Sequence, residues 1–290
     1  MKAKTLSIVT GTEKCISKCP FCVSCECVSD YRPAPKINSR NLRIALRYAD
    51  KCGVDTICLT SRGEPLLYPD MISEYLDLIL NTPNINIPFI ELQTNGILIS
   101  KLKNLKTQMS TWALKGLTHI CLSVVHYKDE YNAANYGKNY PSLVETIKIV
   151  HDMGFSVRLA CIMCNEDGYI HTLDEVFKFI KFAKDNNVEQ VVFRPVNEEF
   201  RREDAHEWCA SHLIPDEVKL HIMDEFEKQG TKLMVLPQIG VIYDVFGQNV
   251  MFSYPMNATI RQTERETARN LIFFPDGRLM YEWEKAGVLL

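Results

Sequence analysis

The sequence has few of the features that mark disordered or basic chains. Only 13 glycines and 13 prolines occur among its 290 residues, and 46% of the residues are apolar. This composition argues against disorder and is typical of a chain that buries a substantial core. The formal charge is only −3. The charge excludes a strongly basic protein that binds duplex nucleic acid through phosphates alone, although a local basic patch stays open.

Long apolar runs are also missing. The start, MKAKTLSIVTG, has no apolar stretch long enough for a signal peptide, and the other apolar runs are far shorter than a bilayer span. The 11 cysteines are odd in number, which favours free thiols and metal ligands over a disulfide framework. We therefore expect a cytoplasmic protein without a membrane partner.

Short β-branched or aromatic runs alternate with segments of helical periodicity over the first two thirds of the chain, which predicts parallel strands joined by crossover helices. The expected strands are 6–10, 56–60, 89–94, 119–124, 156–162 and 190–195. The expected helices are 39–51, 71–81, 100–115, 142–153 and 172–186. Start signals at Asn38-Ser39, Pro141-Ser142 and Thr172 support three of these helices.

Parallel strands with right-handed crossovers close most simply into a barrel, with functional loops at the carboxyl ends of the strands. We therefore predict an α/β fold, a partial (β/α)6 TIM-like barrel over residues 1–200. After residue 200 a helix near 215–229 precedes short strand-like pieces, and RNLIFFPDGRLMYEW predicts a hairpin that turns at Pro275-Asp276-Gly277. Residues 201–290 are expected to form a small C-terminal α+β cap.

A cysteine-rich segment, GTEKCISKCPFCVSCEC, directly follows the first predicted strand. Cys15, Cys19 and Cys22 form C-x3-C-x2-C. Thiolates are the ligands of iron-sulfur clusters, and three of them leave one iron of a 4Fe-4S cluster open. A zinc knuckle or free thiols would fit the same residues, and Cys25 allows other ligand sets. For Cys25 and Cys27 we favour spare or structural thiols over ligands.

The cysteine motif resembles that of the radical S-adenosylmethionine (SAM) superfamily, C-x3-C-x-aromatic-C, because Phe21 precedes Cys22. Three further segments resemble family motifs in the right order. These are Gly63-Glu64-Pro65, Gln93-Thr94-Asn95-Gly96 and Leu122-Ser123-Val124. The resemblance covers about the first 200 residues.

The resemblance implies an enzyme with one 4Fe-4S cluster on Cys15, Cys19 and Cys22. An electron from the reduced cluster would cleave SAM to methionine and a 5′-deoxyadenosyl radical, which removes hydrogen from a substrate. A flavodoxin- or ferredoxin-type reductant would supply the electron. The net reaction stays open among oxidoreductase, isomerase and lyase chemistry.

The resemblance also implies a SAM site. The backbone of Gly63, Glu64 and Pro65 would receive the SAM amino group. By their positions at strand ends, the hydroxyls of Thr94 and Ser123 would reach the methionyl or ribose part of SAM. Arg158 and Arg194 would contact the SAM carboxylate or a substrate anion. A salt bridge, at the surface or inside the barrel, is an equal alternative for both arginines.

Weaker candidates surround this site. Arg62 places a cation beside the motif at 63–65, and Tyr68 follows it; both are candidates for substrate contact. His126 and Tyr127 follow the fourth strand and could touch substrate or move a proton, although a scaffold role is favoured for His126. Cys161 could give a hydrogen atom to a substrate radical, but a buried inert thiol is favoured.

Arg261, Arg265 and Arg269 recur every four residues, which would place them on one face of a helix as a phosphate clamp. Interleaved Glu264 and Glu266 favour a solvated, salt-bridged face instead.

The terminal hairpin resembles that of the auxiliary-cluster (SPASM/twitch) domains of other radical SAM enzymes, but no cysteine follows Cys209, so one cluster is expected. No separate leader-binding domain precedes the first strand, and we therefore expect a small-molecule or nucleotide substrate. A peptide- or protein-modifying enzyme is the alternative, and a non-catalytic iron-sulfur carrier or metal scaffold is the third interpretation.

Overall fold

The alternating pattern folds into parallel strands joined by helices. The computed structural model describes residues 2–22, 36–101, 103–197, 203–236, 239–253, 267–281 and 289–290. The first six strands are β1 (Lys2–Val9), β2 (Thr56–Thr60), β3 (Phe89–Thr94), β4 (His119–Val124), β5 (Ser156–Met163) and β6 (Gln190–Pro195). The helices between them are α1 (Ser39–Lys51), η2 (Pro65–Leu67), α2 (Pro69–Leu80), α3 (Lys103–Leu114), α4 (Asp129–Tyr136), α5 (Leu143–Asp152) and α6 (Leu173–Asp185).

The rest of the chain adds strands to both sides of the same sheet. Its elements are α7 (Glu203–Ser211), α8 (Asp216–Gln229), β7 (Gly230–Leu236), β8 (Gly240–Val245), β9 (Gln248–Ser253), β10 (Thr267–Phe273) and β11 (Leu279–Met280). The strand order is β11-β10-β1-β2-β3-β4-β5-β6-β9-β8-β7. Since β10 pairs with β1 and β9 pairs with β6, both in parallel, eight parallel strands run side by side.

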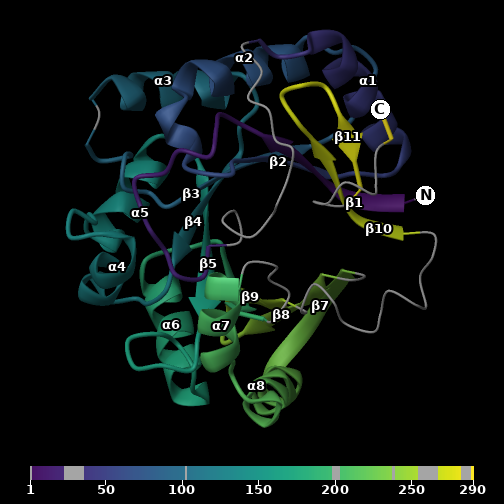
Figure 1. Cartoon of the computed structure of the whole chain (residues 1–290). Coiled ribbons are helices and arrows are strands. Elements are labelled where there is room, and N and C mark those ends of the chain that lie inside the picture. Colours follow the sequence, from purple (N-terminus) through teal and green to yellow (C-terminus); the bar gives the residue numbers. More distant parts are fainter. Residues whose placement is uncertain are drawn as a thin grey trace.

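The sheet curves into an open ring with helices on its outer side (Figure 1). Its edges are β11 and β7, so the ring is a partial TIM-like barrel that does not close. The predicted α/β barrel is therefore confirmed. The hairpin at Pro275-Asp276-Gly277 is present as the antiparallel pair β10 and β11. The expected boundary near residue 200 stays a prediction, because the tail strands extend the barrel sheet.

Helix starts follow the capping signals of the sequence. The side chain of Asn38 accepts a hydrogen bond from the backbone of Asn41 at the start of α1. Thr172 and Glu175 form a reciprocal capping box at the start of α6, and Ser142 caps α5. Such caps satisfy backbone N–H groups that the first turn leaves without partners. The three predicted starts are confirmed.

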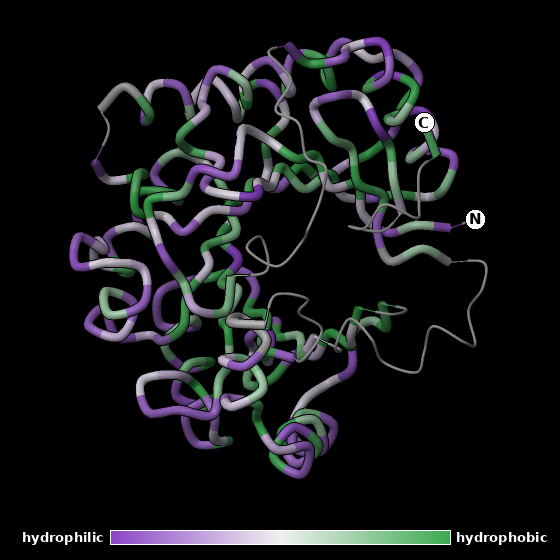
Figure 2. The backbone as a smooth tube through the Cα atoms, viewed as in Figure 1, coloured by the Kyte–Doolittle hydropathy of each residue, from purple (hydrophilic) through white to green (hydrophobic). Residues whose placement is uncertain are grey.

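The two faces of the sheet differ in polarity, and alternation along each strand produces the difference. Strand residues such as Leu6, Ile57, Leu92 and Leu159 pack with the helices in one apolar core. The alternate residues face the inside of the ring and include Cys58, Glu91, Gln93, Cys121, Ser123, Arg158 and Arg194. Apolar colour accordingly concentrates in the strands and in the inner sides of helices, while the outer loops are hydrophilic (Figure 2).

The helices of the described residues include none that is long and apolar enough to span a membrane.

Candidate functional site

The cysteine loop leaves the carboxyl end of β1 and reaches across neighbouring strand ends. Cys15 is exposed, and Cys19 and Cys22 are half-buried. The hydroxyl of Ser17 donates to the backbone carbonyl of Tyr136 at 2.9 Å. The side-chain amide of Asn95 donates in turn to that hydroxyl at 3.3 Å. These bonds tie the loop to α4 and to the end of β3.

Phe21 anchors the same loop in a second apolar cluster at this end of the sheet. Its ring meets Tyr136 and Tyr169 edge-on, with centroids 6.2 and 6.1 Å apart, and lies 6.2 Å from Trp208. Edge-to-face pairs at such distances are favourable beyond the area that they bury. Cys19 packs against this cluster. The aromatic residue of the motif therefore holds one of the three cysteines against the scaffold.

The backbone of the loop after β2 is hydrogen-bonded to the backbone of the cysteine loop. The N–H of Glu64 donates to the carbonyl of Lys14 at 3.0 Å. A Cβ atom on Gly63 would overlap that same carbonyl. Only glycine fits this close approach of two chain segments. Pro65 begins the short helix η2, where a missing N–H costs nothing.

The carboxylate of Glu64 is buried and joins two strand ends. It accepts hydrogen bonds from the hydroxyl of Thr94 at 2.6 Å and from the backbone N–H groups of Asn95 and Leu66 at 3.0 Å each. Burial raises the pKa of Glu64, and the three donors oppose that rise. The side chains of Glu64 and Thr94 thus hold each other in place, so both serve the geometry of the site from inside the scaffold.

Arg62 and Tyr68 contact the residues just before the cysteines. Arg62 is 6% exposed, and its guanidinium lies 3.1 Å from the exposed carboxylate of Glu13. The hydroxyl of Tyr68 bonds that of Thr12. Both residues therefore brace the base of the cysteine loop. Their contact with substrate stays a prediction.

Arg158 lies deeper inside the ring than the strand ends. Its Nη1 is 2.5 Å from Oε2 of Glu91, a carboxylate that is 1% exposed, and Gln93 donates to the other oxygen of Glu91 at 2.9 Å. Two cysteines flank this pair, and burial raises the pKa of Cys121 to about 12 and that of Cys58 further. Arg158 is thus ion-paired within the chain, and its contact with SAM or a substrate anion stays a prediction.

Ser123 and Arg194 face the inside of the ring from strands β4 and β6, and both are half-buried. Within the part of the chain that the structure describes, Arg194 has no ion-pair partner. A half-buried cation that faces the interior is suited to a carboxylate or phosphate of a ligand. Which ligand these residues contact stays a prediction.

His126 and Tyr127 lie on the side of the helices rather than in the ring. The ring of His126 packs between Tyr127 and Tyr131, and its Nδ1 accepts the backbone N–H of Lys128 at 3.0 Å. Burial lowers the pKa of His126 to about 4. Tyr127 packs edge-on against Phe179 of α6. In the described part of the chain these two side chains pack on each other and on residues of α4 and α6, and the scaffold interpretation fits the placement of His126.

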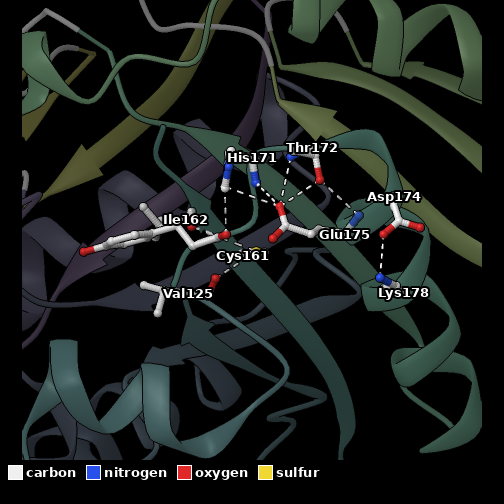
Figure 3. A network of polar contacts seen from close by, with 9 residues as sticks. Val125, Cys161, Ile162, His171, Thr172, Asp174, Glu175 and Lys178 are labelled. Atoms are coloured by element: carbon white, nitrogen blue, oxygen red, sulfur yellow. Dashed lines mark hydrogen bonds and ion pairs between the residues drawn. The ribbon is translucent and has the colours of Figure 1, made fainter. Parts of the chain in front are cut away.

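Cys161 also faces the helices, where it belongs to the apolar core. Its sulfur lies 3.8 Å from the carbonyl oxygen of Val125, and burial raises its pKa well above the usual range. Figure 3 shows this thiol beside Val125, next to the polar network of His171, Thr172 and Glu175 at the start of α6. That placement corresponds to the buried inert thiol that the sequence favoured.

Cys25, Cys27, Arg261 and Arg265 lie outside the described residues. Arg269 lies in strand β10, so the helical spacing proposed for the three arginines does not extend to it.

Sequence reasoning missed Tyr136, Trp208 and Asn132. Asn132 is fully buried, accepts the N–H of Val125 at 2.9 Å and donates to the carbonyl of His126 at 2.7 Å, which fixes the loop after β4. No motif marks these residues, and the shared partner of Tyr136 and Trp208, Phe21, is distant in the sequence.

The profile of the Radical SAM superfamily matches residues 9–180, which include the cysteine loop and all the strand-end motifs. The chain belongs to the radical SAM superfamily. Enzymes of this superfamily use a 4Fe-4S cluster and SAM, which weighs against the interpretation of this radical SAM protein as a non-catalytic carrier.

Solved structures of similar fold include radical SAM proteins with SAM bound. Streptococcus suis SuiB bound to S-adenosylmethionine has a TM-score of 0.59 and 12% identity; the match covers 97% of this chain and 60% of SuiB. The anSMEcpe protein with bound AdoMet has a TM-score of 0.61 and 13% identity, with 98% of this chain and 76% of that chain covered. At such identities the likeness shows the fold alone. This chain spans about three fifths of the length of SuiB.

No curated protein sequence matches the chain significantly.

The donor set of the cysteine loop fits the cofactors of the superfamily by its chemistry, although the described residues do not gather three such side chains closely enough to hold a metal ion. Three cysteines that form no disulfide share one anchored loop, and the described residues place the Gly63–Pro65 segment directly against it. When bound, the cluster would supply the electron for the reductive cleavage of SAM. This chain's own contribution is to hold the loop and to line the ring with polar groups.

Proposed function

We propose that Cys15, Cys19 and Cys22 bind the 4Fe-4S cluster and that SAM lies between this loop and the strand ends at Gly63–Pro65, Thr94 and Ser123. The observation that carries the proposal is the backbone bond from Glu64 to Lys14, which joins the two motifs in one site. The shared anchoring of the loops would pre-organise the cofactor site, and such pre-organisation lowers the entropic cost of a reactive geometry.

We further propose that the substrate is a small molecule or nucleotide that enters the ring. The inner face carries polar and charged groups beside apolar ones such as Ile162 and Val192, and Arg194 offers a half-buried cation. These groups suit a polar, anionic substrate, because a buried cation gains from an anionic partner. The electron would come from a flavodoxin- or ferredoxin-type reductant.

A peptide or protein substrate is the second candidate. Strand β7 lies at an edge of the sheet, and its side chains Leu233, Met234 and Val235 are each more than half exposed. An exposed apolar edge strand can pair with an extended peptide. This observation keeps a peptide-modifying reaction open as the alternative.

The cluster assignment is tested by anaerobic reconstitution of the full chain, followed by measurement of iron, sulfide and 5′-deoxyadenosine formed with reductant and SAM. We expect Cys19→Ala to lose both the cluster and the product. Cys52→Ala is the matched control, because Cys52 is buried at the end of α1, and it should keep both. Full activity of Cys19→Ala would refute the assignment. Cys25→Ala and Cys27→Ala should also keep the cluster.

The substrate class is tested by fractionating a cell extract by size before it is added to the reconstituted enzyme. We expect the low-molecular-weight fraction to stimulate 5′-deoxyadenosine formation, and Arg194→Gln to weaken that response. Stimulation by the protein fraction alone, lost after protease treatment, would favour the peptide alternative. Deuterated candidates that transfer label into 5′-deoxyadenosine then identify the substrate.

A further inference from the structure

Tyr136 carries a buried hydroxyl that has no hydrogen-bond partner among the described residues. The residue ends helix α4 and is 3% exposed. A buried tyrosine hydroxyl normally finds a partner, and leaving it without one costs roughly 1–3 kcal/mol. Among the described residues, none supplies the partner that this hydroxyl would normally find.

The surroundings of Tyr136 belong to the cysteine loop. Its ring meets Phe21 edge-on at 6.2 Å, and its backbone carbonyl accepts the hydroxyl of Ser17. Cys19 packs against the same apolar cluster. Burial raises the pKa of Tyr136 well above the usual range, and Cys19 exerts the largest electrostatic effect among its titratable neighbours. Tyr136 and Cys19 therefore belong to the same group of side chains around Phe21.

Neither of the neighbouring tyrosines, Tyr140 and Tyr169, accepts a hydrogen bond from the hydroxyl of Tyr136. Tyr140 stacks on Tyr136 with ring centroids 5.7 Å apart and planes inclined by 25°, so the two rings meet face to face. Tyr169 also touches Phe21 edge-on, but its hydroxyl bonds the side chain of Asn135. Of the two tyrosines that contact Phe21, only Tyr136 has a hydroxyl left over in the described part of the chain.

We propose that the hydroxyl of Tyr136 donates a hydrogen bond to the sulfur of Cys19 once the cluster is assembled. The proposal rests on the assignment of Cys19 as a cluster ligand. Hydrogen bonds to ligand sulfurs are among the features that set the reduction potential of an iron-sulfur cluster. Reduction adds negative charge, so a donated hydrogen bond stabilises the reduced state more than the oxidised one. Tyr136 would therefore raise the reduction potential, as a positioning residue that acts through the ligand.

The direct test is Tyr136→Phe, which removes the hydroxyl and keeps the ring. The reconstituted full chain is titrated with reductant in the absence of SAM, and the reduced cluster is followed by electron paramagnetic resonance. We expect unchanged iron and sulfide content but a more negative midpoint potential. Formation of 5′-deoxyadenosine should consequently fall more with a weak reductant than with a strong one.

Tyr169→Phe is the matched control, because it removes a hydroxyl beside the same Phe21 that is already bound to Asn135. We expect this variant to keep the wild-type potential. Equal potentials in wild type and Tyr136→Phe would overturn the proposal, as would equal shifts in both variants. A wild-type protein that holds no cluster, or a Cys19→Ala variant that keeps one, would overturn the ligand assignment itself and the proposal with it.

Discussion

The hydroxyl of Thr94 donates a 2.6 Å hydrogen bond to the buried carboxylate of Glu64. Thr94 ends strand β3, whereas Glu64 lies in the loop after β2, so the bond fixes two neighbouring motifs relative to each other. The backbone of Glu64 also holds the cysteine loop through Lys14. A single acidic residue thus couples three segments that are far apart in the sequence.

Replacing Thr94 by valine should destabilise the fold, because the buried carboxylate loses a donor. Hydrogen bonds to charged groups contribute about 2 kcal/mol, so we expect the free energy of unfolding to fall by about that amount. Chemical denaturation of the protein measures the change. Thr94→Ser keeps the hydroxyl and should lose much less. Equal losses in both variants would contradict the assignment, because Thr94→Ser keeps the hydroxyl that Thr94→Val removes.

Replacing Gly63 by alanine should displace the cysteine loop, because the new Cβ would overlap the carbonyl of Lys14. We expect at least a tenfold loss of SAM cleavage, of the order that a small misplacement of reactive groups produces. Measurement of iron content and 5′-deoxyadenosine formation checks this. At Gly53 a Cβ meets no atom within 4 Å. Gly53→Ala should therefore cost only local backbone strain, of about 1 kcal/mol, and keep activity.

Stability should fall at acid pH through His126. Its pKa is lowered to about 4 in the folded state by burial, from an ordinary value of 6.5. Below pH 6.5 the unfolded chain therefore binds a proton that the folded chain excludes, so stability is lost as pH falls toward 4. Between pH 7 and pH 5 we expect wild type to lose about 2 kcal/mol more than His126→Gln. Parallel pH profiles of unfolding for the two proteins would contradict this assignment.

Replacing one partner of the ion pair inside the ring should destabilise the fold more than replacing both partners. Glu91→Gln leaves the Arg158 guanidinium without its charged partner, and such a loss costs about 3–5 kcal/mol. The double variant Glu91→Leu with Arg158→Met replaces both charges by apolar groups and should recover most of that stability. Thermal and chemical unfolding of the three proteins tests the ordering. A double variant less stable than Glu91→Gln would mean that the two charges do not compensate each other.

Local pattern predicted much of the fold, because strand and helix periods and capping residues act over a few neighbours. All six expected strands and the capped helices are present. Helix α4 was not predicted, since its sequence DEYNAANY lacks an apolar stripe. Its last residue, Tyr136, was consequently missed as a neighbour of the cysteine loop.

The sequence by itself determined the superfamily. Its motifs are short segments whose residue types and spacing can be read directly: Cys15, Cys19 and Cys22, and Gly63-Glu64-Pro65. Only the tertiary structure decided which thiols face the ring, how Arg158 is neutralised, and that β9 and β10 extend six parallel strands to eight. These outcomes depend on pairing between distant segments, whose free energy comes from contacts that no local period encodes.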